Sequence, residues 1–251
     1  MKGELKPRKD ETLEVLSGCN LSILQKKKGY RYSLDAYLLG AFVEEAPGTE
    51  VLEIGSGCGV VSLLLGAMKG LRITGVEIQD DMADMSRRSI EYANLSDKIR
   101  ISCGDIREHT GPKVDVIVTN PPYRPLAAGR INPDRSKAMA RHEIALDLDT
   151  LLMKSNQLLR PLGRFYIVYP VWRIPDLICA MRSHRIEPKR MRFVYTSAAG
   201  SSEICLMCGI LGGGREFTLE SPLMIFNEDG TYHREMEMVF QGQTLQKKPL
   251  T

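Results

Sequence analysis

Short runs of apolar, β-branched residues alternate along the chain with segments whose apolar positions repeat at helical spacing. The runs predict strands and the repeats predict helices. We expect strands over residues 51–54, 72–77, 99–102, 114–119 and 165–169, and helices over residues 60–68, 80–94, 148–160 and 174–184. Residues 192–196 and 204–210 predict a final antiparallel hairpin. Such alternation is typical of an α/β protein with a doubly wound, mostly parallel sheet.

The alternating core is flanked by segments of a different character. We expect the core domain to span residues 50–214, with a basic extension over residues 1–49 that packs on it and a C-terminal appendage over residues 215–251. Residues 124–147 show no clean periodicity, and a loop of that length is usually functional or disordered. Residues 161–163 (PLG) are expected to end the helix before them.

Composition narrows the class of protein. The 251 residues are 43% hydrophobic and 26% charged, which excludes a disordered chain. No apolar run approaches the roughly 20 residues that span a bilayer, and the first residues lack the apolar core of a secretory signal. Six scattered cysteines favour a reducing compartment. We therefore expect a cytoplasmic protein without a membrane partner.

The net charge of +3 conceals strong local differences. Basic residues gather in residues 1–31, 124–142 and 182–192, whereas residues 215–237 are mostly acidic. Basic segments of this kind can follow the phosphates of a nucleic acid. The simpler interpretation of each run is a solvated surface.

A glycine-rich loop follows the first strand of the core. Residues 53–59 read EIGSGCG, and glycines at such a turn allow a ligand to approach the backbone. Gly55 and Gly57 fit the dinucleotide fingerprint G-x-G-x-x-G, but Val60 stands where its third glycine belongs. The loop therefore fits a nucleotide-type cofactor site but does not meet the dinucleotide fingerprint, and a glycine loop alone is weak evidence.

Three acidic residues lie at the carboxyl ends of successive strands, where a doubly wound sheet binds ligands. Glu53 ends the first strand, Glu77 ends the second, and Asp105 follows the third. Glu77 is placed to accept hydrogen bonds from ribose, and Asp105 with Ile106 to hold an adenine. Glu53 favours a cation near the cofactor's amino end. The alternative for each acid is a helix N-cap or a solvated carboxylate.

Residues 120–123 (NPPY) follow the fourth strand and indicate the type of reaction, because they can bind an amino group. The Asn120 side-chain oxygen and a proline carbonyl can both accept hydrogen bonds from one amino group. Positive charge grows on that nitrogen during methyl transfer, so fixed acceptors stabilise the transition state. Tyr123 can stack on a planar base. We expect Asn120, Pro121, Pro122 and Tyr123 to form the catalytic set, against the alternative of a plain turn.

Four motifs, namely residues 53–59, Glu77, Asp105 and residues 120–123, together resemble the signature of S-adenosylmethionine-dependent amino-methyltransferases. The resemblance implies a Rossmann-like class I methyltransferase fold and the cofactor S-adenosylmethionine, with S-adenosylhomocysteine as product. It implies that Gly55 and Gly57 contact the cofactor, that Glu77 binds its ribose, and that Asn120 to Tyr123 hold the target amine. Candidate cofactor contacts are Asp35, Glu53, Gly55, Gly57, Glu77, Ile78, Asp105, Ile106 and Asn120.

Flanking segments narrow the resemblance to bacterial adenine-N6 methyltransferases of valine tRNA, which act beside the anticodon. Residues 32–40 (YSLDAYLLG) resemble a segment that helps to enclose the cofactor, which makes Asp35 a candidate contact. Residues 140–143 and 223–232 also resemble that group, although Ser33 stands where glycine is common. Expected RNA contacts come from the basic segments: Lys26, Lys27, Lys28, Arg124 and Arg141.

Several alternatives remain. The same tetrad serves methylation of rRNA guanine N2 and of protein glutamine N5, although the glutamine group usually has a longer N-terminal domain. Other classes are a nicotinamide-dependent oxidoreductase and a non-catalytic RNA-binding module. Cys205 and Cys208 have the spacing of half a metal site but lie in an apolar run without a second pair, so no metal is expected. Trp172 is expected to pack or to line a rim.

Overall fold

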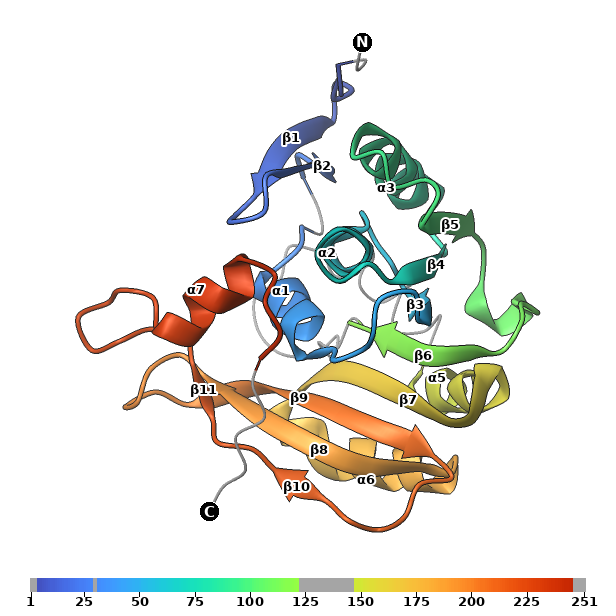
Figure 1. Ribbon diagram of the computed structural model, residues 1–251, viewed down its shortest axis with the longest axis vertical. Helices are drawn as coiled ribbons and strands as arrows, with labels where there is room; N and C mark the ends of the chain where they lie inside the picture. Colours follow the sequence, from blue (N-terminus) through green and yellow to red (C-terminus); the bar gives the residue numbers. More distant parts are fainter. Residues whose placement is uncertain (1–3, 29–30, 122–146, 246–251) are drawn as a thin grey trace.

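A large twisted sheet forms the centre of the molecule in a computed structural model, which describes residues 4–28, 31–121 and 147–245 (Figure 1). Its strand order is β10-β8-β9-β7-β6-β3-β4-β5, with β11 also beside β8. The strands are β3 (Glu50–Ile54), β4 (Arg72–Glu77), β5 (Ile99–Cys103), β6 (Val114–Thr119), β7 (Leu159–Pro170), β8 (Ile186–Tyr195), β9 (Ser202–Leu211), β10 (Thr218–Leu219) and β11 (Leu223–Met224). Among these strands β9 alone runs antiparallel to its neighbours, β7 and β8. The expected doubly wound, mostly parallel sheet with a closing hairpin is therefore confirmed.

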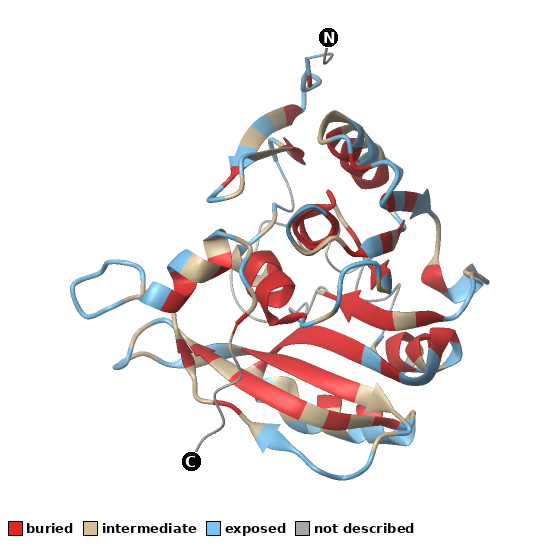
Figure 2. Cartoon of the chain, in the orientation of Figure 1, coloured by how far each residue is buried: buried red, intermediate tan, exposed pale blue. Residues whose placement is uncertain are grey.

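Helices cover both faces of this sheet. One face carries α1 (Leu34–Phe42), α2 (Val60–Lys69) and α3 (Asp80–Tyr92), and the other carries α5 (Leu148–Leu158) and α6 (Ile174–Ser183). Strand β7 shows the alternation that two covered faces require, because Tyr166 and Val168 join one core and Phe165 and Ile167 join the other. The central strands are consequently buried along most of their length (Figure 2).

Two expected boundaries were wrong. The helix of residues 148–160 ends at Leu158, and β7 begins at once with Leu159. Residues 161–163 therefore lie inside the strand instead of ending the helix. The register explains how they fit: Val114 pairs with Leu159 but Val116 pairs with Arg164, so β7 bulges between these positions, with Leu162 at φ +62°. The closing hairpin also extends well beyond residues 192–210.

The N-terminal segment contains structure that the sequence pattern did not predict. Strands β1 (Glu11–Leu16) and β2 (Leu21–Lys26) form an antiparallel hairpin that packs against α3. The Leu24 backbone N–H donates to the buried Ser89 hydroxyl of α3 at 3.0 Å. At the other end of the chain, α7 (Arg234–Phe240) packs on α1, with the Tyr37 and Phe240 rings 5.5 Å apart. Among the described residues, no helix combines the length and apolar character that crossing a membrane requires.

Candidate active site

The sheet register brings the predicted strand ends together. Ile54 pairs with Val76 on one side and with Thr119 on the other. The Thr119 hydroxyl also donates to the Ile54 carbonyl at 2.9 Å, which stabilises the pairing of these two residues across β3 and β6. Strand order reverses between β3 and β6, and the crevice at such a reversal is where doubly wound sheets bind ligands. The glycine loop and Asn120 therefore begin next to each other at this edge.

The glycine loop leaves open space in which a cofactor could approach the protein backbone. Gly55 has φ +73°, and a Cβ atom built on it would meet no atom within 4 Å. The Gly57 backbone N–H donates to the Glu77 carboxylate at 2.7 Å, and the Gln79 N–H donates to the same carboxylate at 2.9 Å. Glu77 is 4% exposed. The acid predicted to bind ribose thus also ties the glycine loop to the end of β4.

Glu53 is buried behind the loop. Its carboxyl group accepts a short hydrogen bond from the Ser62 hydroxyl of α2. Burial, together with the nearby charge of Glu77, raises the pKa of Glu53 to about 8. A buried carboxyl in this state is neutral near pH 7 and becomes a carboxylate most readily when a cation lies next to it. Sequence reasoning found Glu53 but missed Ser62, which carries no motif of its own.

The turn after β5 carries the predicted adenine contacts. Asp105 caps the short helix η1 (Ile106–Glu108) by accepting from the Arg107 N–H at 2.8 Å, and the Arg107 guanidinium lowers the pKa of Asp105. The capping alternative is therefore present in the structure. Ile106 is 6% exposed and packs into the core under α5. Lys154 of α5, which the sequence did not single out, donates to the Arg107 and His109 carbonyls and holds this turn.

The remaining predicted site residues differ in exposure. Ile78, next to Glu77, is 45% exposed and offers an apolar surface that suits the face of a ring. Asp35 lies half-buried in the first turn of α1. Asn120 and Pro121 are partly exposed at the end of β6. Pro122, Tyr123, Arg124 and Arg141 lie outside the described residues, so their expected roles stay predictions.

The lysines of the hairpin lie near this same edge. Lys26 forms an ion pair with Asp81, which stands in the first turn of α3, four residues after Glu77. The Lys27 ammonium donates to the Lys9 carbonyl at 2.7 Å, and Lys28 is exposed. The β1–β2 hairpin therefore places lysines beside the helix that begins at the cofactor edge.

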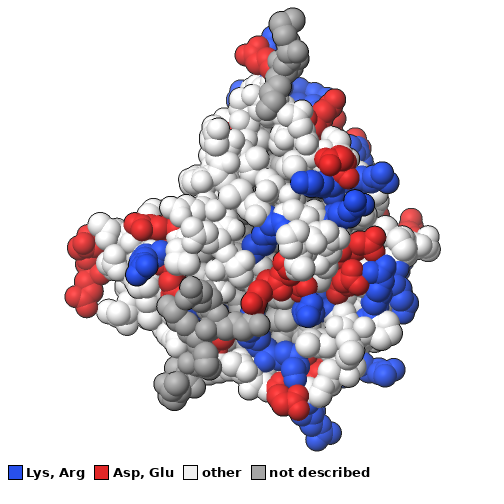
Figure 3. Space-filling model, viewed as in Figure 1, with Lys and Arg blue, Asp and Glu red and all other residues white. Residues whose placement is uncertain are grey.

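The basic segment of residues 182–192 forms a surface only in part: Arg182 and Arg185 are exposed, but Arg190 and Arg192 are buried. Arg192 is fully buried and donates to both carboxylate oxygens of Glu235 at 2.9 Å. Arg190 pairs with Glu44 and Glu220, and Lys189 pairs with Glu216 at 2.8 Å. Glu220 and Glu235 of the acidic C-terminal segment thus pair with the two buried arginines of this basic segment. On the face in Figure 3, acidic and basic side chains accordingly lie intermixed.

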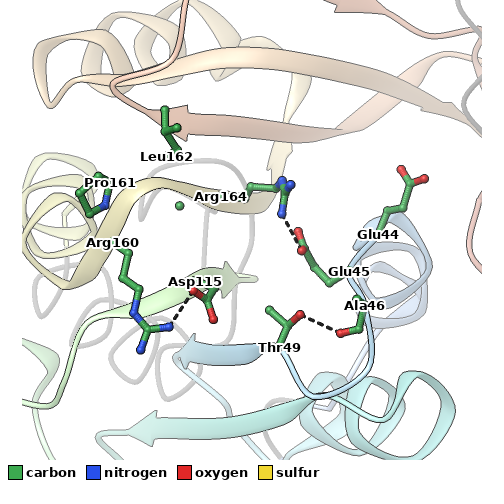
Figure 4. Close-up of a pocket in the computed structure, with 10 residues that line it drawn as sticks. Glu44, Glu45, Ala46, Thr49, Asp115, Arg160, Pro161, Leu162 and Arg164 are labelled. Atoms are coloured by element: carbon green, nitrogen blue, oxygen red, sulfur yellow. Dashed lines mark hydrogen bonds and ion pairs between the residues drawn. The ribbon is translucent and has the colours of Figure 1, made fainter.

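A charged pocket lies at the opposite edge of the sheet, around the amino ends of β3, β6 and β7 (Figure 4). Its ionic side chains are paired: Arg160 with Asp115 at 2.7 Å, and Arg164 with Glu45 at 2.7 Å. The Tyr166 hydroxyl donates to Glu45 as well. These contacts fasten the segment before β3 to β7, and they lie away from every predicted site residue.

Comparison with known proteins identifies the family and the fold. The family model of the methyltransferase small domain matches residues 35–171. A tRNA1(Val) (adenine(37)-N6)-methyltransferase of Porphyromonas gingivalis is 31% identical over 194 residues, covering 73% of this chain and 75% of the relative. A predicted O-methyltransferase from Agrobacterium tumefaciens, protein Atu636, superposes with a TM-score of 0.69 at 16% identity, covering 86% of this chain and 99% of that one.

A geranyl diphosphate C-methyltransferase from Streptomyces coelicolor A3(2), solved with S-adenosyl-L-homocysteine, superposes with a TM-score of 0.51 at 16% identity, covering 70% of this chain and 77% of that one. The sheet topology and the glycine loop beside Asn120 therefore define a protein of the Rossmann-like class I methyltransferase fold. Within that class, the chain belongs to the methyltransferase small domain family.

Proposed function

We propose that this protein transfers a methyl group from S-adenosylmethionine to the exocyclic N6 nitrogen of an adenine in tRNA, next to the anticodon. The observation that carries the proposal is the pairing of Ile54 with Thr119, which sets Asn120 beside the open glycine loop. The substrate class is supported by the relatives that bear the name tRNA1(Val) (adenine(37)-N6)-methyltransferase.

The residues at this edge fit the cofactor. The open space above Gly55 lets the cofactor approach the protein backbone. Ile78 offers an apolar face for its adenine, and the buried carboxylate of Glu77 suits its ribose hydroxyls. Gly57, Asp105 and Asp35 would complete the contacts. When bound, the sulfonium of S-adenosylmethionine supplies an electrophilic methyl group.

Asn120 and Pro121 then act on the target amine. Their side-chain and backbone oxygens accept its two N–H groups, which orients the nitrogen lone pair and draws it out of conjugation with the base. Positive charge develops on that nitrogen in the transition state, so these acceptors contribute more there than in the ground state. We expect the predicted stacking by Tyr123 to hold the base above them.

A transfer assay with labelled cofactor tests the proposal. Purified protein is incubated with bulk tRNA, rRNA and protein fractions, and we expect label in N6-methyladenine of tRNA alone. Asn120→Ala should lower kcat by about 100- to 1,000-fold, the typical effect of removing one transition-state hydrogen-bonding partner, while calorimetric binding of S-adenosylmethionine persists. Label confined to rRNA guanine or to protein glutamine would overturn the tRNA assignment, and calorimetric binding of NAD instead of S-adenosylmethionine would overturn the enzyme class.

We also propose that the protein acts in the cytoplasm, where tRNA is modified. All six cysteines, which lie within the described residues, are free thiols in the structure. This is the state that a reducing compartment maintains.

A further inference from the structure

An exposed tryptophan lies just beyond the carboxyl end of β7. Trp172, the sole tryptophan of the chain, stands in the short helix η2 (Val171–Arg173) and is 63% exposed. Tryptophan is strongly buried in most proteins, because its large apolar surface is costly to leave in water. Of the two expectations for Trp172, packing or a place on a rim, its exposure contradicts the first and agrees with the second.

Arg173 links this side chain to the sheet. Its guanidinium carbon lies 5.7 Å from the centre of the Trp172 ring and 5.3 Å from that of the buried Tyr169 ring. Its Nε atom lies 3.6 Å from an Asp176 carboxylate oxygen. Arg173 thus lies in contact with both rings and with Asp176. We name Tyr169, Trp172 and Arg173 the aromatic–arginine platform.

The register of β6 and β7 places this platform beside the target-amine site. Ile167 pairs with Thr119, so Asn120 is one residue and Trp172 five residues beyond the same level. With about 3.3 Å per residue along a strand and about 4.8 Å between strands, continuing the strand geometry from this pair puts the two backbones roughly 14 Å apart. Both lie at the carboxyl edge of the sheet. The nucleotides that flank a bound target adenine therefore come within reach of the platform.

We propose that the aromatic–arginine platform stacks an unpaired base of the RNA next to the target adenine. This inference rests on the proposed function and adds a positioning contact to it. Proteins hold single-stranded bases against aromatic rings and guanidinium planes, since every base has a π-face. A tryptophan backed by a cation also suits the negative charge of the adjoining phosphates.

The sole tryptophan provides a direct readout. Titration with a single-stranded RNA oligonucleotide should quench its fluorescence, whereas an abasic oligonucleotide of equal length and charge should not. Trp172→Ala should raise the Kd for the base-bearing oligonucleotide and the KM for tRNA by about 5- to 100-fold, as loss of one stacked base does. The KM for S-adenosylmethionine should stay unchanged. Trp172→Phe should keep much of the wild-type RNA affinity. Arg173→Lys, which keeps the charge but lacks the planar guanidinium, should weaken RNA binding.

Phe217→Ala is the matched control, because Phe217 is an aromatic residue that is 44% exposed, next to β10 and away from this edge. Equal quenching by the two oligonucleotides, or equal Kd and tRNA KM for Trp172→Ala and wild type, would overturn the platform. The proposed function fails on a different result, the absence of label in tRNA, and the fluorescence titration tests the platform in either case.

Discussion

At the residue scale, two features of the predicted cofactor site stand out: Gly55 has no side chain, and Glu53 is a buried acid. Gly55 is open to solvent where the cofactor backbone is expected, and Glu53 is a buried acid whose pKa is raised to about 8. Both were found from the sequence by their place at the end of one strand. Their physical states came from the tertiary surroundings.

Gly55→Ala tests the open space above the loop. The substitution should weaken S-adenosylmethionine binding at least about tenfold in calorimetry, because a methyl group would occupy the backbone approach. Gly48→Ala is a matched control: Gly48 has φ +86°, and its Cβ would likewise meet no atom within 4 Å. Both variants should lose about 1 to 2 kcal/mol of folding free energy from left-handed backbone strain. Equal cofactor affinity in the two variants would contradict this assignment of Gly55.

Glu53 should make the ligand-free protein less stable as pH rises. The folded state holds a proton on Glu53 up to about pH 8, whereas the unfolded chain releases it near pH 4.3. Between these values the folded state binds more protons, so the free energy of unfolding falls, by at most about 1.4 kcal/mol per pH unit. Glu53→Gln should remove this dependence, with the largest gain over wild type near pH 8.

Urea unfolding at pH 5, 6, 7 and 8 measures that dependence. Glu228→Gln, at an exposed loop position, should follow the wild-type curve. Parallel curves for Glu53→Gln and wild type would show that Glu53 is ionised in the folded protein throughout this range.

At the element scale, the β1–β2 hairpin is held on α3 by an ionic cluster. Arg88 of α3 pairs with Glu11 of β1 and with Asp84, and Arg8 pairs with the same Asp84 at 2.7 Å. Glu11 is 5% exposed, and Arg88 is the cation that pairs with its carboxylate. The sequence pattern missed this hairpin because its two strands are short and its buried contacts come from a helix about 70 residues further along the chain.

Arg88→Ala should loosen the hairpin selectively. Removing one partner leaves the Glu11 carboxylate buried without its cation, at a cost of about 1 to 3 kcal/mol. Arg8→Ala should cost less than about 1 kcal/mol, because the Arg8 side chain is 60% exposed. Urea unfolding and hydrogen exchange of the hairpin amides measure both variants. Equal losses in the two variants would mean that Glu11 does not depend on Arg88.

At the scale of the whole molecule, charge is arranged by folding more than by sequence neighbourhood. The basic segment of residues 182–192 and the acidic segment of residues 215–237 meet through Arg190, Arg192 and Glu235 among others. Arg190 and Arg192 are therefore internal ion-pair partners, whereas Arg182 and Arg185 of the same segment stay exposed. The lysines of the β1–β2 hairpin remain near the cofactor edge.

Lys27→Glu combined with Lys28→Glu should weaken RNA binding and flatten its salt dependence. For a single-stranded contact, each phosphate no longer neutralised lowers the slope of log Kd against log salt by about 0.7. Lys98→Glu with Lys113→Glu makes the same charge change at the opposite edge, near the amino ends of β5 and β6. Filter binding of tRNA from 50 to about 300 mM salt should separate the two pairs. The same slope and affinity in both double variants would exclude a hairpin contact.

The sequence by itself determined the doubly wound core and the positions of the glycine loop, Glu53, Glu77, Asp105 and Asn120 along it. Periodicity and strand-end residues are local, and the topology of parallel strands brings their ends to one edge without further information. Tertiary structure alone decided the hairpin on α3, the bulge in β7, the raised pKa of Glu53, the pairing of the two charged segments and the exposure of Trp172. Each of these depends on which distant residues meet and on how much water they exclude, and the order of residues along the chain does not contain that information.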